Sequence, residues 1–554
     1  MKVVKLDYCN NQKQLYPWFL WLVLFFVFGA KMQASVYNKH IIPLNQHVFD
    51  ATAVMPGDTI FIASGARKSL RINSIKGDSA RYIVVTNGGD EVVIENQDIH
   101  YGLVISQSSY FRLTGSADNS DKYRIRILGT GKGGNGLSLD DFCTDYEVDH
   151  IEIANTGFAG IFAFTHPTCD LMANRGNFVQ RNTVFRNNYI HDTAGEGMYI
   201  GHSFYNGYTK ICDGVSTTLY PHEIHGLKVF DNKLENNGYD GIQVSCAAED
   251  TEIFNNVLIG YGKKNETMQQ AGIQIGAGSK VRCYNNVIFS GSGTGIMMFG
   301  FADSYFYNNL IVGAGNTHNS TTDQVRVHGI FIDDRCTLEN TSFYLLNNTI
   351  ISPKADGIRF YSTISKKNLI ANNLILNPGA MYTAFSSENK FVNIKSGVDV
   401  QMLNNVFSNY FVKCDLLQCV DSLKYLLSNL PLYKQGIEVS WYGIYYDLNM
   451  SLRNPIPSVG CYEYSETGQS RIFSNNVSLS LDNMSGNMSV FNHSEDTIKY
   501  IELFDLHGRV VMKQKTEETS FFQMNIKQYR VGSPLVVRVK TNKQTISVLI
   551  PNIL

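Results

Sequence analysis

The middle of the chain repeats one short pattern of apolar and polar positions. A Gly is followed by an apolar residue, a variable residue and a second apolar residue, and Asn pairs or an Asp-Asn pair stand between these phrases. The shortest intervals between the Asn positions are 23 to 25 residues, as between Asn286 and Asn309 or between Asn348 and Asn373. A repeat of this length predicts a solenoid. The glycines of the phrase are Gly160, Gly197, Gly241, Gly272, Gly295, Gly329 and Gly357.

Short alternating strands with Gly and Asn at the corners favour a parallel β-helix. A leucine-rich repeat is a poorer match because its Leu spacing and its helical segment are missing. In a parallel β-helix each strand pairs with its equivalent one coil further, about 4.8 Å away, so equivalent residues stack in columns. Asn suits such columns because it forms side-chain ladders and accepts left-handed corners. We therefore predict an all-β protein with a parallel β-helix over residues 38–465.

The two ends of the chain have a different character. After Tyr464 a polar stretch leads to alternating strands broken by Gly508 and Gly532, which predicts a small β-sandwich over residues 466–554. At the other end, lysines precede an apolar run from Leu15 to Ala30, and a small residue, Ala34, follows. This layout predicts a secretory signal peptide over residues 1–34, with a single membrane anchor as the alternative.

Composition narrows the function classes. The chain has 554 residues, of which 44% are hydrophobic and 17% charged, so it is ordinary globular material. A net charge of -2 without a strongly basic face argues against nucleic-acid binding. Of ten Cys, nine would remain after removal of the signal peptide, which excludes a fully paired framework. Cys169 and Cys212 are one candidate disulfide pair and Cys414 and Cys419 another, and we expect most of the others to be buried free thiols.

Parts of the chain resemble two known families. "VMPGDTIFIASG" (Val54–Gly65), the repeated coils and "IPSVGCYEY" (Ile456–Tyr464) resemble the right-handed parallel β-helix, or pectate-lyase-like, superfamily as found in Bacteroidetes. "LFDLHGRVV" and the strands after it resemble the C-terminal sorting domain of the type IX secretion system. The resemblance implies a right-handed coil and a protein that the type IX machinery exports, to be released or held at the outer-membrane surface. We expect a monomer.

Aligning the phrases on Gly reveals a column of variable residues. By alternation, the residue two positions after each Gly should point to solvent. Tyr199, Gln243 and Gln274 form an aromatic and amide section of this column, and such groups favour carbohydrate. The alternative is that they only suit an exposed sheet. The full column is Phe162, Tyr199, Gln243, Gln274, Met297, Phe331 and Arg359.

The residue before each Gly forms a second column. Glu196 and Asp240 occupy it in successive coils, and we expect them at the edge of the sheet because two buried carboxylates would be costly. Two carboxylates about one strand spacing apart would form an acid/base pair or bind a cation such as Ca²⁺. The alternative is that Glu196 and Asp240 only cap corners of the coil. A second candidate cluster, in "RVHGIFIDDRC", contains His328, Asp333, Asp334 and Arg335, which resemble the groups of polygalacturonase-like hydrolases or form a charged loop edge.

Two long insertions surround Glu196, and long loops on a rigid solenoid usually build a binding site. The first insertion (residues 164–182) and the second insertion (residues 201–226) contribute Arg175, His202, Tyr205 and His222. We expect His202 or His222 as a base, Arg175 as an anion clamp and Tyr205 as a substrate contact. "HEIH" (His222–His225) lacks the helical spacing of a zinc site, so no metal ligands are predicted.

The function predicted from these residues is cleavage of a polysaccharide by a lyase or a glycoside hydrolase. A lyase needs a cation to neutralise a uronate and a base to remove the proton next to its carboxylate, whereas a hydrolase needs two carboxylates. The sequence offers both sets. A non-catalytic, glycan-binding or adhesive surface solenoid is the alternative.

Overall fold

The computed structural model describes most of the chain from Tyr37 to Ile550. The predicted signal peptide and the Cys414–Cys419 pair lie outside the described residues. No helix in the described part of the chain is long and apolar enough to cross a membrane. The residues left out are 1–36, 117–122, 318–326, 380–389, 410–422, 424–426, 428–429, 431, 465–470, 475–476, 483–486, 493–496, 506–508, 520, 527–534, 542–544 and 551–554.

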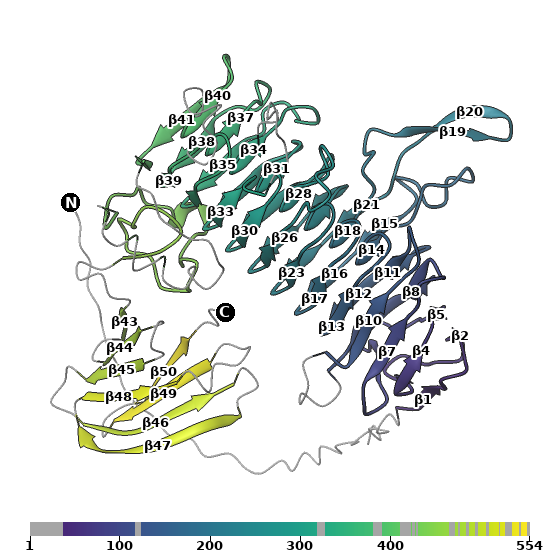
Figure 1. Ribbon diagram of the computed structural model, residues 1–554, viewed down its shortest axis with the longest axis horizontal. Helices are drawn as coiled ribbons and strands as arrows, with labels where there is room; N and C mark the ends of the chain where they lie inside the picture. The colour runs from purple at the N-terminus through teal and green to yellow at the C-terminus, as the bar shows by residue number, and fades with distance from the viewer. Residues whose placement is uncertain are drawn as a thin grey trace, which may run out of the picture. The chain divides into compact units, whose positions relative to one another are not determined.

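Three long parallel sheets form the wall of a β-helix (Figure 1). Each strand pairs in parallel with its equivalent one coil further, and such crossover connections are right-handed in nearly all proteins. The predicted all-β, right-handed parallel β-helix is therefore confirmed. Sheet A has 13 strands, in the order β1 (Lys39–Ile42), β3 (Thr59–Ile62), β6 (Ile83–Asn87), β9 (Ser109–Thr114), β12 (Thr144–Asp149), β16 (Thr183–Arg186), β22 (Lys228–Phe230), β26 (Thr251–Phe254), β29 (Val281–Tyr284), β32 (Ser304–Tyr307), β35 (Phe343–Leu346), β38 (Asn368–Ala371) and β41 (Val400–Leu403).

The other two sheets have 12 strands each. Sheet B, which contains the Gly phrase, consists of β2 (Val48–Asp50), β5 (Leu70–Asn73), β8 (Tyr101–Ser106), β11 (Asn135–Asp140), β14 (Ile161–Ala163), β18 (Met198–Ile200), β24 (Ile242–Val244), β28 (Ile273–Ile275), β31 (Ile296–Met298), β34 (Ile330–Ile332), β37 (Ile358–Phe360) and β40 (Val392–Ile394). Sheet C consists of β4 (Gly65–Arg67), β7 (Val92–Glu95), β10 (Ile125–Gly129), β13 (Ile151–Ala154), β17 (Tyr189–His191), β23 (Lys233–Glu235), β27 (Val257–Ile259), β30 (Val287–Gly291), β33 (Leu310–Ala314), β36 (Thr349–Ile351), β39 (Leu374–Leu376) and β42 (Val406–Ser408).

The repeated residues of the coils have distinct structural tasks. The two apolar residues after each Gly point inward and form one continuous core, in which Ile242, Ile273 and Ile296 are fully buried. The Gly itself lies where backbone and side chains crowd together, because a Cβ on Gly329 would stand 2.4 Å from Ile350 Cγ2 and 2.6 Å from Gly357 O. The Gly recurs because most coils have no room for a larger residue at this position, although Phe391 occupies it in the coil of β40.

The Asn pairs divide two tasks between them. The first residue of each pair has a left-handed backbone, with φ near 54° at Asn285 and 55° at Asn308. The second residue forms a buried ladder in which each amide nitrogen donates to the next amide oxygen at 2.9–3.0 Å. The predicted corners and side-chain ladder are both confirmed. The ladder runs through Asn188, Asn232, Asn256, Asn286, Asn309, Asn348, Asn373 and Asn405.

The insertions only partly leave the coil. Residues 179–181 and 223–225 pair as β15 (Val179–Arg181) and β21 (Glu223–His225) with β25 (Ala247–Glu249) in an extra parallel sheet. The coil is therefore left only at 164–178 and 201–222, and the latter segment contains the antiparallel hairpin β19 (Tyr208–Cys212) and β20 (Val215–Leu219). The predicted Cys169–Cys212 disulfide is present and joins the two insertions.

The chain after the last coil forms two further parts. Residues 432–464, which include a short 3-10 helix, η3 (Ser440–Tyr442), pack Val459, Cys461 and Ile444 against the outer faces of the coil. The C-terminal part is the predicted β-sandwich, because its two antiparallel sheets share one apolar core. These sheets are β43 (Arg471–Ser474), β44 (Val477–Asp482), β45 (Asn487–Asn492) and β48 (Phe521–Asn525), and β47 (Val510–Thr519), β46 (Ile498–Phe504), β49 (Leu535–Thr541) and β50 (Thr545–Ile550).

Candidate functional site

The structure stacks the predicted site residues but buries them. Tyr199, Gln243 and Gln274 are in register on β18, β24 and β28. The Tyr199 hydroxyl lies 2.8 Å from Ser203 Oγ, Gln243 Nε2 donates to the same Oγ at 2.9 Å, and Gln274 Nε2 donates to Gln243 Oε1 at 3.2 Å. The prediction of a solvent-facing column is wrong here, since Gln243 is 4% and Gln274 6% exposed. The second insertion folds over the sheet and places Ser203 on these side chains.

The second predicted column is buried as well. Glu196 is 3% exposed and Asp240 is fully buried, so the expectation that the two carboxylates avoid burial is wrong, although both lie just outside β18 and β24 at the edge of the sheet. Their coils are adjacent, because the Gly197 N–H donates to the Asp240 carbonyl oxygen. Asp240 Oδ1 accepts from the Ala271 N–H at 2.6 Å, while Asp240 Oδ2 and Glu196 Oε2 have no hydrogen-bond partner among the described residues.

Burial changes the protonation of this carboxylate pair. Desolvation raises the pKa of Glu196 to about 7. Desolvation, and then the charge of Glu196, raise the pKa of Asp240 well above its usual range. Two oxygens without partners fall short of the six to eight that Ca²⁺ takes, so the pair alone does not fit this ion. The raised pKa values favour the protonated form of both carboxyl groups over a bound Ca²⁺ ion. The catalytic role of Glu196 and Asp240 stays a prediction.

A pH dependence of stability follows from this pair. The unfolded chain releases the Glu196 proton near pH 4.5 and the folded chain near pH 7, so the contribution of Glu196 to stability is full below pH 4.5 and is lost as pH rises to about 7. The loss amounts to roughly 3 kcal/mol. We expect Glu196→Gln to remove the Glu196 part of this decline in urea unfolding measured from pH 4.5 to 8, while the exposed-site control Glu339→Gln keeps it. An unchanged slope in Glu196→Gln would count against the protonated pair.

The predicted groups of the insertions are engaged within the protein. His222 Nε2 accepts from the Thr165 N–H at 3.1 Å and His222 Nδ1 contacts the Glu223 carbonyl oxygen at 3.1 Å, so backbone groups occupy both ring nitrogens. Burial lowers the pKa of His222 to about 4. His202 stacks on Tyr208 with ring centroids 5.1 Å apart, and burial, aided by nearby histidines, lowers the pKa of His202 to about 4 as well.

Arg175 and Tyr205 brace the two insertions. The Arg175 guanidinium lies 3.6 Å from the centroid of the Tyr205 ring and donates to the Tyr205 carbonyl oxygen. The Tyr205 hydroxyl donates to Glu223 Oε1 at 2.9 Å, which also lies 3.8 Å from Arg175 Nε. These contacts give Arg175 and Tyr205 a structural task, and their predicted ligand contacts are untested.

The disulfide adds to this bracing. Cys169 and Cys212 are 43 residues apart, and closure of a loop of this length contributes roughly 2–4 kcal/mol by constraining the unfolded chain. We expect the Cys169→Ser/Cys212→Ser variant to be cleaved faster by chymotrypsin near the exposed Leu171 and Phe204, with the coil itself intact. The control is Cys336→Ser, which removes a free thiol. Equal cleavage rates in both variants would exclude this role.

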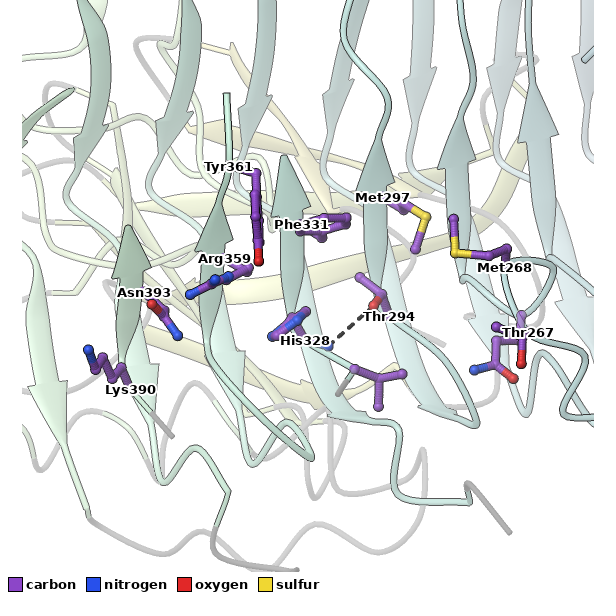
Figure 2. A pocket seen from close by; sticks show the side chains of 12 residues that line it. Thr267, Met268, Thr294, Met297, His328, Phe331, Arg359, Tyr361, Lys390 and Asn393 are labelled. Atoms are coloured by element: carbon purple, nitrogen blue, oxygen red, sulfur yellow. Dashed lines mark hydrogen bonds between the residues drawn. The ribbon is translucent and has the colours of Figure 1, made fainter. Parts of the chain in front are cut away.

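An open cleft lies further along sheet B, outside the predicted section. Its volume is about 580 Å³ and it spans the coils of β28, β31, β34, β37 and β40. Figure 2 shows Lys390, Asn393 and Arg359 together at one end and Met268 with Met297 at the other. The lining residues are Thr267, Met268, Gln270, Thr294, Met297, Val327, His328, Phe331, Arg359, Tyr361, Lys390 and Asn393.

A buried carboxylate organises the polar side of the cleft. Asp356 is fully buried in the column before the Gly phrase, one coil after His328. Asp356 Oδ2 lies 3.2 Å from His328 Nδ1 and accepts from Asn393 Nδ2 at 3.1 Å. Asp356 Oδ1 accepts from the Lys390 N–H at 2.8 Å. One carboxylate therefore fixes the orientation of an imidazole and an amide that both line the cleft.

The cations of the cleft are available to a ligand. Arg359 stacks on Tyr361, with the guanidinium 4.4 Å from the ring centroid, and Lys390 is exposed. Neither side chain forms an ion pair with a described residue. None of the described residues that line the cleft is a carboxylate. The cleft is thus suited to an anion.

The second cluster predicted from the sequence is divided by the structure. Arg335 Nε donates to Asp333 Oδ2 at 2.5 Å, and Asp334 lies 3.7 Å from Lys395. Of this cluster only His328 lines the cleft. Asp333, Asp334 and Arg335 therefore match the alternative prediction, a charged loop edge. Among the described residues no group of three or more His, Cys, Asp or Glu is placed to hold a metal ion.

No protein-family model and no curated protein matches the chain. Among solved structures it is similar to a pectate lyase, at 12% identity and a TM-score of 0.42, over 77% of this chain and 97% of that one. It is similar to a lacto-N-biosidase from Eubacterium ramulus (12% identity, TM-score 0.38, 65% and 63% coverage) and to an alginate lyase from a Paenibacillus species (14%, 0.34, 68% and 99%). At these values none of the three assigns a reaction to this chain.

Proposed function

We propose that the protein binds an acidic polysaccharide in the cleft on sheet B and cleaves it by β-elimination. The observation that carries this proposal is a pair of cations that form no ion pair with a described residue, together with a histidine held by a buried carboxylate. A glycoside hydrolase of the usual kind needs two carboxylates at the scissile bond, and the described lining of the cleft has none. The lining favours a lyase.

The residues divide the reaction between them. Arg359 and Lys390 bind the carboxylate of a uronate unit, which makes the proton on the adjacent carbon more acidic. His328 removes that proton, the bond from the next carbon to the glycosidic oxygen breaks, and a carbon–carbon double bond forms. The leaving oxygen takes up a proton, so the products are a new chain end with a hydroxyl group and an unsaturated uronate. Asp356 positions His328, because its carboxylate and its backbone N–H both contact His328 Nδ1.

A product assay tests this function. Polygalacturonate, alginate, glycosaminoglycans and neutral plant glycans are incubated with the protein while absorbance at 235 nm and reducing ends are followed. The proposal predicts absorbance and reducing ends in equal amounts from an acidic polymer. Reducing ends without absorbance would point to a hydrolase and overturn the mechanism. Binding without either product would favour the non-catalytic surface solenoid.

We also propose that the protein is exported and that its C-terminal sandwich is a type IX sorting domain. A disulfide between the insertions supports an oxidising compartment, where such bonds persist. The sandwich supports a separable domain because it has an apolar core of its own. Mass spectrometry of the protein from culture medium and from cell surfaces should find a chain that starts after Ala34. An uncleaved chain inside the cell would contradict the proposal.

A further inference from the structure

The chemistry of the cleft changes along the axis of the β-helix. Arg359 and Lys390 belong to the coils of β37 and β40, whereas Met297 lies on β31 and Met268 precedes β28 (Figure 2). In the register of sheet B, Met297 and Arg359 are two strand spacings apart, or about 9.6 Å. Neighbouring units of a bound polymer therefore meet different surroundings.

The end opposite the cations carries two methionines, Met268 and Met297. Phe331, on β34, lies between this end and Arg359 (Figure 2). Thioether side chains are flexible and polarizable, so they adapt to small apolar groups, but they form no strong hydrogen bonds with hydroxyls. This end of the cleft thus favours a sugar that carries a methyl-bearing substituent over one that carries only hydroxyl groups.

A polar group accompanies the methionines. Gln270 lines the cleft and is 6% exposed, and its Oε1 has no hydrogen-bond partner among the described residues. A buried acceptor without a partner is unfavourable, and a ligand N–H or O–H would satisfy it. An acylated amino group offers an N–H donor and a methyl group within one substituent, which matches Gln270 beside the two methionines.

We propose that the cleft selects a polysaccharide in which a uronate alternates with an N-acylated amino sugar. The uronate carboxylate lies at Arg359 and Lys390, and the acylamino group lies among Gln270, Met268 and Met297. This inference rests on the proposed function, since it names the substrate class of the same cleft. It also predicts that a polymer built only of uronates binds less tightly, because its hydroxyl groups face the methionines.

Affinity electrophoresis of the full-length protein tests the inference. The gels contain hyaluronan, heparosan, N-deacetylated heparosan, re-N-acetylated heparosan or polygalacturonate. We expect the N-acetylated polymers to retard the protein at concentrations at least about 10-fold lower than the deacetylated polymer or polygalacturonate, and re-acetylation to restore retardation. Met297→Ser and Gln270→Leu should reduce this preference, whereas Met402→Ser, at a half-exposed position on sheet A, should keep it.

The outcomes separate the inference from the function on which it rests. Equal retardation by polygalacturonate and by the N-acetylated polymers would overturn the inference and leave the acidic-polysaccharide function standing. A preference for N-acetylated polymers that survives both cleft substitutions would overturn the placement of the acylamino group. No retardation by any uronate polymer would overturn the proposed function and the inference with it.

Discussion

We expect the His328→Asn variant to cleave an acidic polysaccharide about 10² to 10⁴ times more slowly than the unchanged protein, the usual effect of losing a general base. Asn approximates the size of the imidazole and keeps polar groups in the cleft, but it cannot take up the substrate proton. KM should change little, because Arg359 and Lys390 still hold the uronate. The measurement is kcat and KM from initial rates of absorbance at 235 nm.

Two further variants make this result specific. Asp356→Asn should also lower kcat and should alter the pH profile of kcat, since Asp356 acts through the orientation of His328. His191→Asn is the matched control, because His191 pairs with Glu152 and Asp192 on sheet C and lies outside the cleft. A His328→Asn variant that is folded and keeps kcat within a factor of two would remove His328 from the mechanism.

We expect Asn309→Ala to destabilise the β-helix by roughly 3–5 kcal/mol, because several buried groups lose their partners at once. Asn309 Nδ2 donates to the Cys283 carbonyl oxygen at 2.9 Å and to Asn348 Oδ1 at 3.0 Å. Asn309 Oδ1 accepts from the backbone and side-chain nitrogens of Asn286 at 3.1 and 3.0 Å. Urea unfolding followed by far-UV circular dichroism measures the change.

The control for this experiment is Asn45→Ala, at an exposed turn before β2, for which we expect a change within about 0.5 kcal/mol. In a solenoid each coil contacts mainly its neighbours, so the loss should appear as early unfolding of the coils around Asn309. A destabilisation below 1 kcal/mol would mean that the amide ladder contributes much less than its hydrogen bonds suggest.

The fold could be predicted from the sequence because stacking imposes the same demand on every coil. A crowded Gly329 and a laddered Asn309 have counterparts in one coil after another, so spacing alone reveals the repeat. The disulfide was predictable for a related reason, since Cys169 and Cys212 stand in the two segments that interrupt the repeat. What spacing cannot reveal is where those segments fold.

The position of the candidate site depends on where the two insertions fold, which the spacing of the repeat does not show. The alternation of apolar and polar residues correctly predicted that Gln243 points away from the core. It could not predict that the second insertion covers Gln243, with Ser203 bonded to its side chain. The cleft was not predicted partly because the coil of β40 carries Phe391 where the neighbouring coils have Gly, so an alignment on Gly does not include Lys390 and Asn393. A signal was present: His328 and Asp356 follow one another in the column before Gly, and Arg359 stands two residues after it.

The most direct test of the central claim is a crystal structure of His328→Asn soaked with a uronate-containing hexasaccharide from a polymer that the protein retains. The account predicts sugar density in the cleft between Met297 and Asn393, with a carboxylate at Arg359. Density at Glu196 and Asp240, beneath displaced insertions, would contradict it and return the site to the section first predicted from the sequence.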